Sequence, residues 1–142
     1  LSPKIPEDLR INIKVQHHTK IESFKYWLIL LENMEEKTIF VRTLGGTPII
    51  RVLDFLIEGR DLDYSLTDIA ENSNIGWTTL HRIWNNLEKN QVVKHTRMIG
   101  KAKLYRLNKE NLAIKQLIRF YDTLLVQSAN EVVNKKELIV EV

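Results

Sequence analysis

Cysteine is absent from this chain of 142 residues. The absence excludes disulfide bonds, thiolate nucleophiles and thiolate metal ligands, and it is compatible with the reducing cytoplasm, which we expect as the location. Long apolar runs are also missing although 44% of the residues are hydrophobic, so the sequence predicts no membrane-spanning helix. The first residues do not have the pattern of a secretory signal, because Pro3 and Pro6 interrupt a mixed polar stretch.

Patterns that indicate catalysis or cofactor binding are scarce. His17, His18 and Glu22 are residue types that bind metals, but their spacing matches no strong zinc signature, and adjacent histidines are usually solvated. Gly45 and Gly46 precede a predicted helix and could hold an anion, but they lack the lysine and third glycine of nucleotide-binding loops. We therefore expect no enzyme activity, no metal site and no cofactor.

The segment from Ser65 to Asn90 has the pattern of two helices joined by a tight turn. Ser65 suits the N-cap of the first helix, and Asn74 suits the turn because asparagine tolerates a left-handed backbone. The second helix has an apolar stripe at helical spacing, which consists of Leu80, Ile83, Trp84 and Leu87. This arrangement is typical of a helix-turn-helix, in which the second helix enters the major groove of DNA.

The other face of the second helix is mostly polar. Its candidate DNA-contacting residues are Trp77, Thr78, Thr79, His81, Arg82, Asn85, Asn86 and Lys89. Arginine pairs bidentately with guanine and asparagine with adenine, so this face carries the groups that base readout requires. Since any exposed helix face is polar, the helix alone favours DNA binding only weakly.

Positive charge is concentrated in the segment that follows. Residues 88–109 contain seven lysines and arginines and one glutamate, a formal charge of +6, whereas the whole chain carries +3. Concentrated positive charge beside a recognition helix is typical of phosphate binding. The same segment predicts a hairpin with strands over residues 92–97 and 102–107. Its candidate phosphate contacts are Lys94, Arg97, Lys101 and Lys103.

A further helix is predicted upstream, with Thr47 as N-cap, Pro48 at its first position and Gly59 after its end. Residues 62–64 could add a third strand to the hairpin, and Tyr105 should pack on the helices. The order of helix, strand, helix, turn, helix and hairpin predicts a winged helix-turn-helix. The expected fold class is mainly α with a small antiparallel β wing.

Residues from Thr47 to about Leu125 resemble the archaeal winged helix-turn-helix transcriptional regulators. The resemblance is carried by TPIIRVLDFLIEGRDLDYSLTDIAENSNIG, TTLHRIWNNLEKNQVVKHTR and IGKAKLYRLN, a little over half of the chain. It implies a DNA-binding regulator, usually dimeric, with a recognition helix over residues 77–89 in the major groove. It also implies a wing over residues 97–103 on the backbone or minor groove. Gly76 departs from the family, which commonly has a serine cap there.

Two extensions flank the predicted winged helix domain of residues 47–109. In the first, residues 1–46, the alternation over residues 9–15 predicts a strand and the spacing from Phe24 to Met34 a helix, as a dimerisation arm or a cover for the core. Met34 could instead be the natural start, which would make the preceding residues an upstream extension.

The second extension, residues 110–142, contains an amphipathic helix. Leu117, Tyr121 and Leu124 lie on its apolar face, which could form a dimer contact or pack on its own domain. Residues 138–142 predict a strand that could pair with the one near the N-terminus.

The expected partners are double-stranded DNA and a second copy of the chain. Winged helices also serve as protein-contact modules in transcription or replication machinery, and the charge of residues 88–109 favours DNA over this alternative. The DNA sequence bound, the sign of regulation and any effector stay open.

Overall fold

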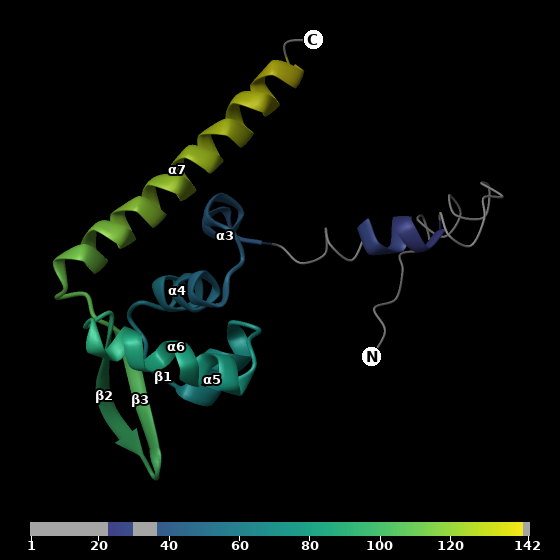
Figure 1. Ribbon diagram of the computed structural model, residues 1–142. Coiled ribbons are helices and arrows are strands. Elements are labelled where there is room, and N and C mark those ends of the chain that lie inside the picture. The colour runs from purple at the N-terminus through teal and green to yellow at the C-terminus, as the bar shows by residue number, and fades with distance from the viewer. Residues whose placement is uncertain (1–22, 30–36, 141–142) are drawn as a thin grey trace. The chain divides into compact units, whose positions relative to one another are not determined.

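The computed structural model describes residues 23–29 and 37–140 (Figure 1). The chain divides into two units, Leu1–Glu36 and Lys37–Val142, which are considered separately.

In the first unit, residues 23–29 are helical, in agreement with the predicted spacing. Trp27 is half-buried there, whereas Phe24 and Leu28 are exposed. The predicted strand over residues 9–15 lies outside the described residues. So do His17, His18, Glu22 and Met34.

The second unit is a winged helix-turn-helix, which confirms the predicted fold class. Its elements are α3 (Ile39–Leu44), α4 (Pro48–Glu58), β1 (Tyr64–Ser65), α5 (Leu66–Asn72), α6 (Trp77–Lys89), β2 (Val93–Ile99), β3 (Ala102–Leu107) and α7 (Leu112–Val140). The three strands form one antiparallel sheet in the order β1-β3-β2, and the β2–β3 hairpin projects beyond α5 and α6 (Figure 1).

Local signals determine where α4 and α5 begin and end. Pro48 occupies the first turn of α4, which ends at Gly59, where an added Cβ would overlap the hydroxyl of Tyr64. Ser65 and Asp68 form a reciprocal capping box at the start of α5, so two free amides of its first turn are satisfied. Pro48, Gly59 and the Ser65 cap were expected from the sequence, and the bounds of α4 agree with it.

The core lies where α4, α5, α6, the base of the hairpin and the first half of α7 meet. The residues that are almost fully buried there are Phe40, Val52, Leu56, Ile57, Ile69, Leu80 and Leu107. Phe40 comes from α3, a six-residue helix that the sequence pattern did not reveal, and it packs against Tyr121 of α7 with ring centroids 5.2 Å apart. The winged helix therefore shares its core with segments on both sides of residues 47–109.

Three predicted elements need correction. Residues 138–140 continue α7 as a helix, so the strand predicted over residues 138–142 is wrong for its described part. Strand β2 runs on to Ile99, which leaves a two-residue turn at Gly100 and Lys101 in place of the longer connection expected. Strand β1 begins at Tyr64, later than predicted.

Candidate nucleic-acid interface

The turn between α5 and α6 sets the direction of the recognition helix. Asn74 has φ 52, the left-handed conformation expected for it, and the Ile75 amide donates to the Ala70 carbonyl over 3.1 Å. The guanidinium of Arg51 on α4 donates to the Asn74 carbonyl over 3.3 Å. Gly76 has an ordinary φ of −69 and space for a side chain, so no steric need for glycine exists there.

Helix α6 has one buried and one exposed face. Leu80, Trp84 and Leu87 enter the core, as the spacing predicts. The exposed residues are Trp77, Thr78, His81, Arg82, Asn85, Asn86 and Lys89, while Thr79 is half-buried. The groups that could read base edges therefore lie together on the solvent face, and their contact with DNA stays a prediction.

Tyr105 attaches the hairpin to the recognition helix. It is 6% exposed, and its ring packs edge-on against Trp84 of α6 with centroids 5.1 Å apart. Leu107 lies on the same side and is buried as well. This packing confirms the role expected for Tyr105 and fixes the hairpin beside α6.

A β-bulge in β2 ties the hairpin to the residue before β1. Register shifts between His95 and Arg97, so Thr96 has no partner on β3. Adjacent residues of a regular strand point to opposite faces, whereas the bulge lets Thr96 and Arg97 reach the same carboxylate. The Thr96 hydroxyl and Arg97 Nε each donate to Oδ2 of Asp63 over 2.8 Å, and a second Arg97 nitrogen donates to Oδ1 over 3.0 Å.

These hydrogen bonds shift the ionisation of Asp63. Donation from Arg97, followed by donation from Thr96, lowers the pKa of this carboxyl from 3.8 to about 2. Arg97 was expected to contact phosphate, but in this structure its planar guanidinium holds the wing to the rest of the sheet. A bidentate pair of this kind is directional, so it restricts the wing more than a single lysine contact would.

Two further cations of the segment are paired with acids. Lys94 contacts Glu110 at 3.0 Å and Lys109 contacts Asp61 at 2.5 Å, and each lysine lowers the pKa of its partner carboxyl. Glu110 directly follows residues 88–109, whereas Asp61 lies 48 positions before Lys109, so the count of +6 overstated the free charge. Among the described residues, Lys89, Lys101 and Lys103 form no ion pair.

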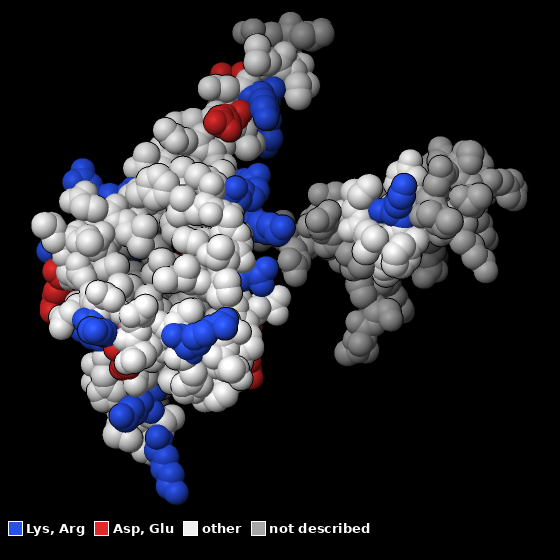
Figure 2. All heavy atoms as spheres, in the orientation of Figure 1, with Lys and Arg blue, Asp and Glu red and all other residues white. Residues whose placement is uncertain are grey.

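The projecting hairpin therefore presents a smaller cationic surface than the sequence suggested. Lys101 and Lys103 are exposed near its tip, and Figure 2 shows blue side chains on the hairpin at the lower end of this view. Trp77 is 51% exposed at the start of α6 and packs edge-on against His81.

A hollow of about 280 Å³ lies between the start of α6 and the wing. It is lined by Ser65, Leu66, Thr67, Trp77, Lys101, Ala102, Lys103 and Tyr105. The hollow thus brings two of the predicted wing lysines together with one predicted recognition-helix residue.

The inner half of α7 belongs to the core of its own domain. Tyr121 is 4% exposed against Phe40, and burial raises the pKa of its hydroxyl to about 12. Leu117 and Leu124 are half-buried against the same core. The three residues predicted as a dimer contact thus pack within the chain, and Tyr121 is already covered there. Arg60, in the turn after α4, forms a bidentate pair with Asp122 of α7, with a shortest distance of 2.7 Å.

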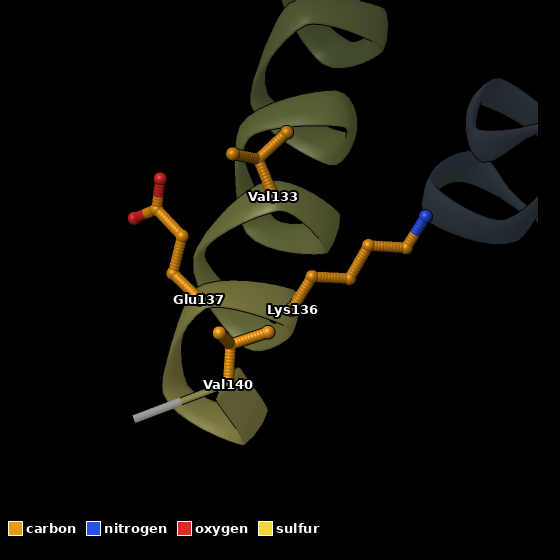
Figure 3. A pocket seen from close by; sticks show the side chains of 4 residues that line it. All are labelled: Val133, Lys136, Glu137 and Val140. Atoms are coloured by element: carbon orange, nitrogen blue, oxygen red, sulfur yellow. The ribbon is translucent and has the colours of Figure 1, made fainter. Parts of the chain in front are cut away.

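The outer half of α7 exposes an apolar stripe instead. Its members recur every seven residues, as Leu125 with Val126, Val132 with Val133, and Ile139 with Val140. Figure 3 shows Lys136 and Glu137 splayed to either side between Val133 and Val140, around a shallow hollow that these four residues line.

The sequence contained no signal that would have identified the contacts of Asp63. Its partners are 33 and 34 positions away, and only the bulge brings both to it.

None of the helices in residues 23–29 and 37–140 is long and apolar enough to cross a bilayer.

No protein-family model matches the chain, and no curated protein does. Among solved structures, it is similar to NadR in complex with 4-hydroxyphenylacetate, at 16% identity and a TM-score of 0.49, over 89% of this chain and 90% of that one. Lactococcus lactis ZitR in complex with DNA has 14% identity and a TM-score of 0.47, over 89% and 93%. The homodimeric winged helix-turn-helix DNA-binding domain of Mb0332 from Mycobacterium bovis, a possible ArsR-family transcriptional regulator, has 17% identity and a TM-score of 0.43, over 82% and 92%.

Proposed function

We propose that the winged helix binds double-stranded DNA as a transcriptional regulator, with α6 in the major groove and the wing on the adjoining backbone or minor groove. The observation that carries the proposal is the exposed polar face of α6, which the hollow at Trp77 joins to Lys101 and Lys103 of the wing. Arg82 and Asn85 supply hydrogen-bonding groups for base edges, while Lys101 and Lys103 supply phosphate contacts. Membership of the archaeal winged helix-turn-helix regulators belongs to this proposal and rests on the sequence of residues 47–125.

Selection of bound duplexes from a random pool, followed by titration at several salt concentrations, tests the proposal. If Lys89, Lys101 and Lys103 each neutralise one phosphate, log K should fall with log[salt] at a slope of about −3 per protomer. A slope of about −5 would mean that the three paired cations also release their acids and contact DNA. Failure to retain any duplex even at low salt would contradict DNA binding.

A protein-contact module is the second candidate, and one observation favours it. Three of the seven cations in residues 88–109 are paired with acids, and apolar side chains such as Trp77 are exposed beside the remaining lysines. A surface for protein alone would bind no duplex at low salt, so the same titration separates the two candidates.

We also propose that a second copy covers the outer half of α7. A single recognition helix reads few base pairs, and a two-fold dimer reads two half-sites about 34 Å apart. The exposed stripe has the seven-residue period typical of paired helices. Lys136 and Glu137 lie on either side of Val133 and Val140 with opposite charges, so a parallel twofold pairing can bring each against its opposite on the other copy.

A further inference from the structure

The tip of the hairpin is a tight turn with apolar residues beside it. Ile99 and Ala102 are paired across the strands, and only Gly100 and Lys101 connect them. Gly100 has φ 59, while Lys101 is not among the described residues with positive φ, which is the pattern of a type II′ turn. Such a turn is short and matches the strand twist, so it holds the residues beside it in a defined position.

Met98 and Ile99 are exposed at this tip, by 54% and 57% respectively. Successive residues of a strand point to opposite faces, so the two side chains lie on different faces of the ribbon. Ile99 lies opposite Ala102, whose methyl group is too short to cover it, and Met98 lies opposite Lys103. Both apolar side chains are thus left open to solvent at the end of the hairpin.

Two lysines lie next to these two side chains. Lys101 follows in the turn and Lys103 lies beside Met98 on β3. An apolar tip flanked by lysines is complementary to a surface that is anionic outside and apolar inside. The minor groove of DNA offers such a surface where a base step opens, since phosphates line its rim and the stacked faces of the base pairs are apolar. A protein surface would need an acidic ring around an apolar pocket.

We infer that the tip of the wing is an apolar wedge, with Ile99 or Met98 entering the minor groove, opening one base step and bending the duplex. This inference rests on the proposed function and adds DNA bending to it. Isoleucine and methionine are among the side chains that insert between base steps, and such insertion bends duplexes by about 20–90°. The lysines would neutralise the phosphates that the insertion brings close.

The attachment of the wing supports such a role. A wedge must push against a fixed base, because a mobile hairpin would yield before the base step opened. The contacts of Asp63 with Thr96 and Arg97 lie directly behind Met98, and Tyr105 fixes the hairpin to α6.

The test uses a duplex selected from the random pool, labelled at its two ends for energy transfer. A second set of duplexes carries 2-aminopurine at successive positions where the wing is expected, since its fluorescence rises on unstacking. The full chain should increase the transfer efficiency and brighten 2-aminopurine at one step only. Met98→Ser with Ile99→Ser should return both signals to those of the free duplex while leaving the salt slope unchanged.

Conservative and matched variants keep the test specific. Ile99→Leu with Met98→Leu should retain the bend, because an apolar side chain remains at both positions. Leu62→Ser alters a residue that is exposed to a similar extent (61%) away from the tip, and it should leave both signals unchanged. All variants are compared by thermal melting.

Two results would overturn the inference while leaving the proposed function intact. One is a duplex that binds the wild-type chain but stays straight, and the other is a bend that survives the double serine variant. If the wild-type chain binds no duplex at all, the proposed function fails and the wedge fails with it.

Discussion

Arg82 is the residue on which base readout can be tested most directly. It is exposed in the middle of α6 and makes no hydrogen bond within the described part of the chain. Arg82→Ala should therefore leave the melting temperature unchanged. On the selected duplex it should cost about 1–3 kcal/mol, the value of a bidentate contact with a base.

Fluorescence anisotropy with selected and random duplexes measures this loss. Arg119→Ala removes an exposed arginine from α7 and serves as the matched control. Equal losses on both duplexes would assign Arg82 to phosphate instead of a base.

The ionisation of Asp63 gives a second test at the residue scale. Its pKa in the folded chain is about 2, below the ordinary 3.8, because Arg97 and Thr96 donate to the carboxylate. The contact therefore stabilises the fold above about pH 4, and this contribution is lost as pH falls toward 2. Carboxyl NMR titration of Arg97→Met should show the pKa of Asp63 moving toward its ordinary value.

Asp61 provides the internal control for that titration. Its pKa is lowered mainly by its hydrogen bond with Lys109, so Arg97→Met should leave it unchanged. A pKa of Asp63 that did not respond to Arg97→Met would contradict the bracing of the wing described above.

At the scale of elements, the hairpin contains lysines that are paired with acids and lysines that are not, and the two kinds should contribute differently to the salt dependence of DNA binding. Lys101→Ala with Lys103→Ala should reduce the salt slope by about two, since each lysine is expected to neutralise one phosphate. Lys94→Ala with Lys109→Ala removes the same charge from the same segment, but these lysines are paired with Glu110 and Asp61. The slope should change less for this second pair.

Binding to duplex at four or more salt concentrations measures both slopes. The prediction is wrong if the two double variants reduce the slope equally, because pairing with acids would then have no effect on DNA contact.

Elements with local signals could be predicted from sequence, whereas contacts between distant segments could not. Ser65, Pro48 and Asn74 act within a turn or two of the chain, so the helices and the turn between α5 and α6 were correctly expected. Helix α3 is too short for a periodic pattern and depends on packing by Phe40.

The two errors of greatest consequence both come from judging a segment by its own residues, without the rest of the chain. The strand expected over residues 138–142 rested on β-branched residues, but a helix that already runs from Leu112 extends more readily than a new strand forms. The free charge of residues 88–109 was overestimated because Asp61 and Asp63 reach it only through the fold and Glu110 lies directly after the counted residues.

For the whole molecule, the central prediction concerns the second copy. Val126→Glu with Val133→Glu places two charges one heptad apart on the exposed stripe of α7. The variant should sediment as a folded monomer and lose most affinity for the selected duplex while retaining weak nonspecific binding. The reason is that dimer contact would bring the introduced glutamates of the two copies against one another.

Gln127→Glu with Asn134→Glu is the matched control, because both positions are exposed on the opposite side of α7. It adds the same charge and should stay dimeric. A wild-type chain that sediments as a monomer at micromolar concentration would contradict the dimer.

The unequal burial along α7 has a consequence for how the backbone exchanges its amide hydrogens. Near Ile114 and Tyr121 the helix opens only when the core opens, so exchange there should be as slow as global unfolding. Beyond Ser128 every described residue is exposed, and in a single copy those amides should exchange as fast as those of a fraying helix. Protection that appears beyond Ser128 as protein concentration rises would therefore report the association of two copies.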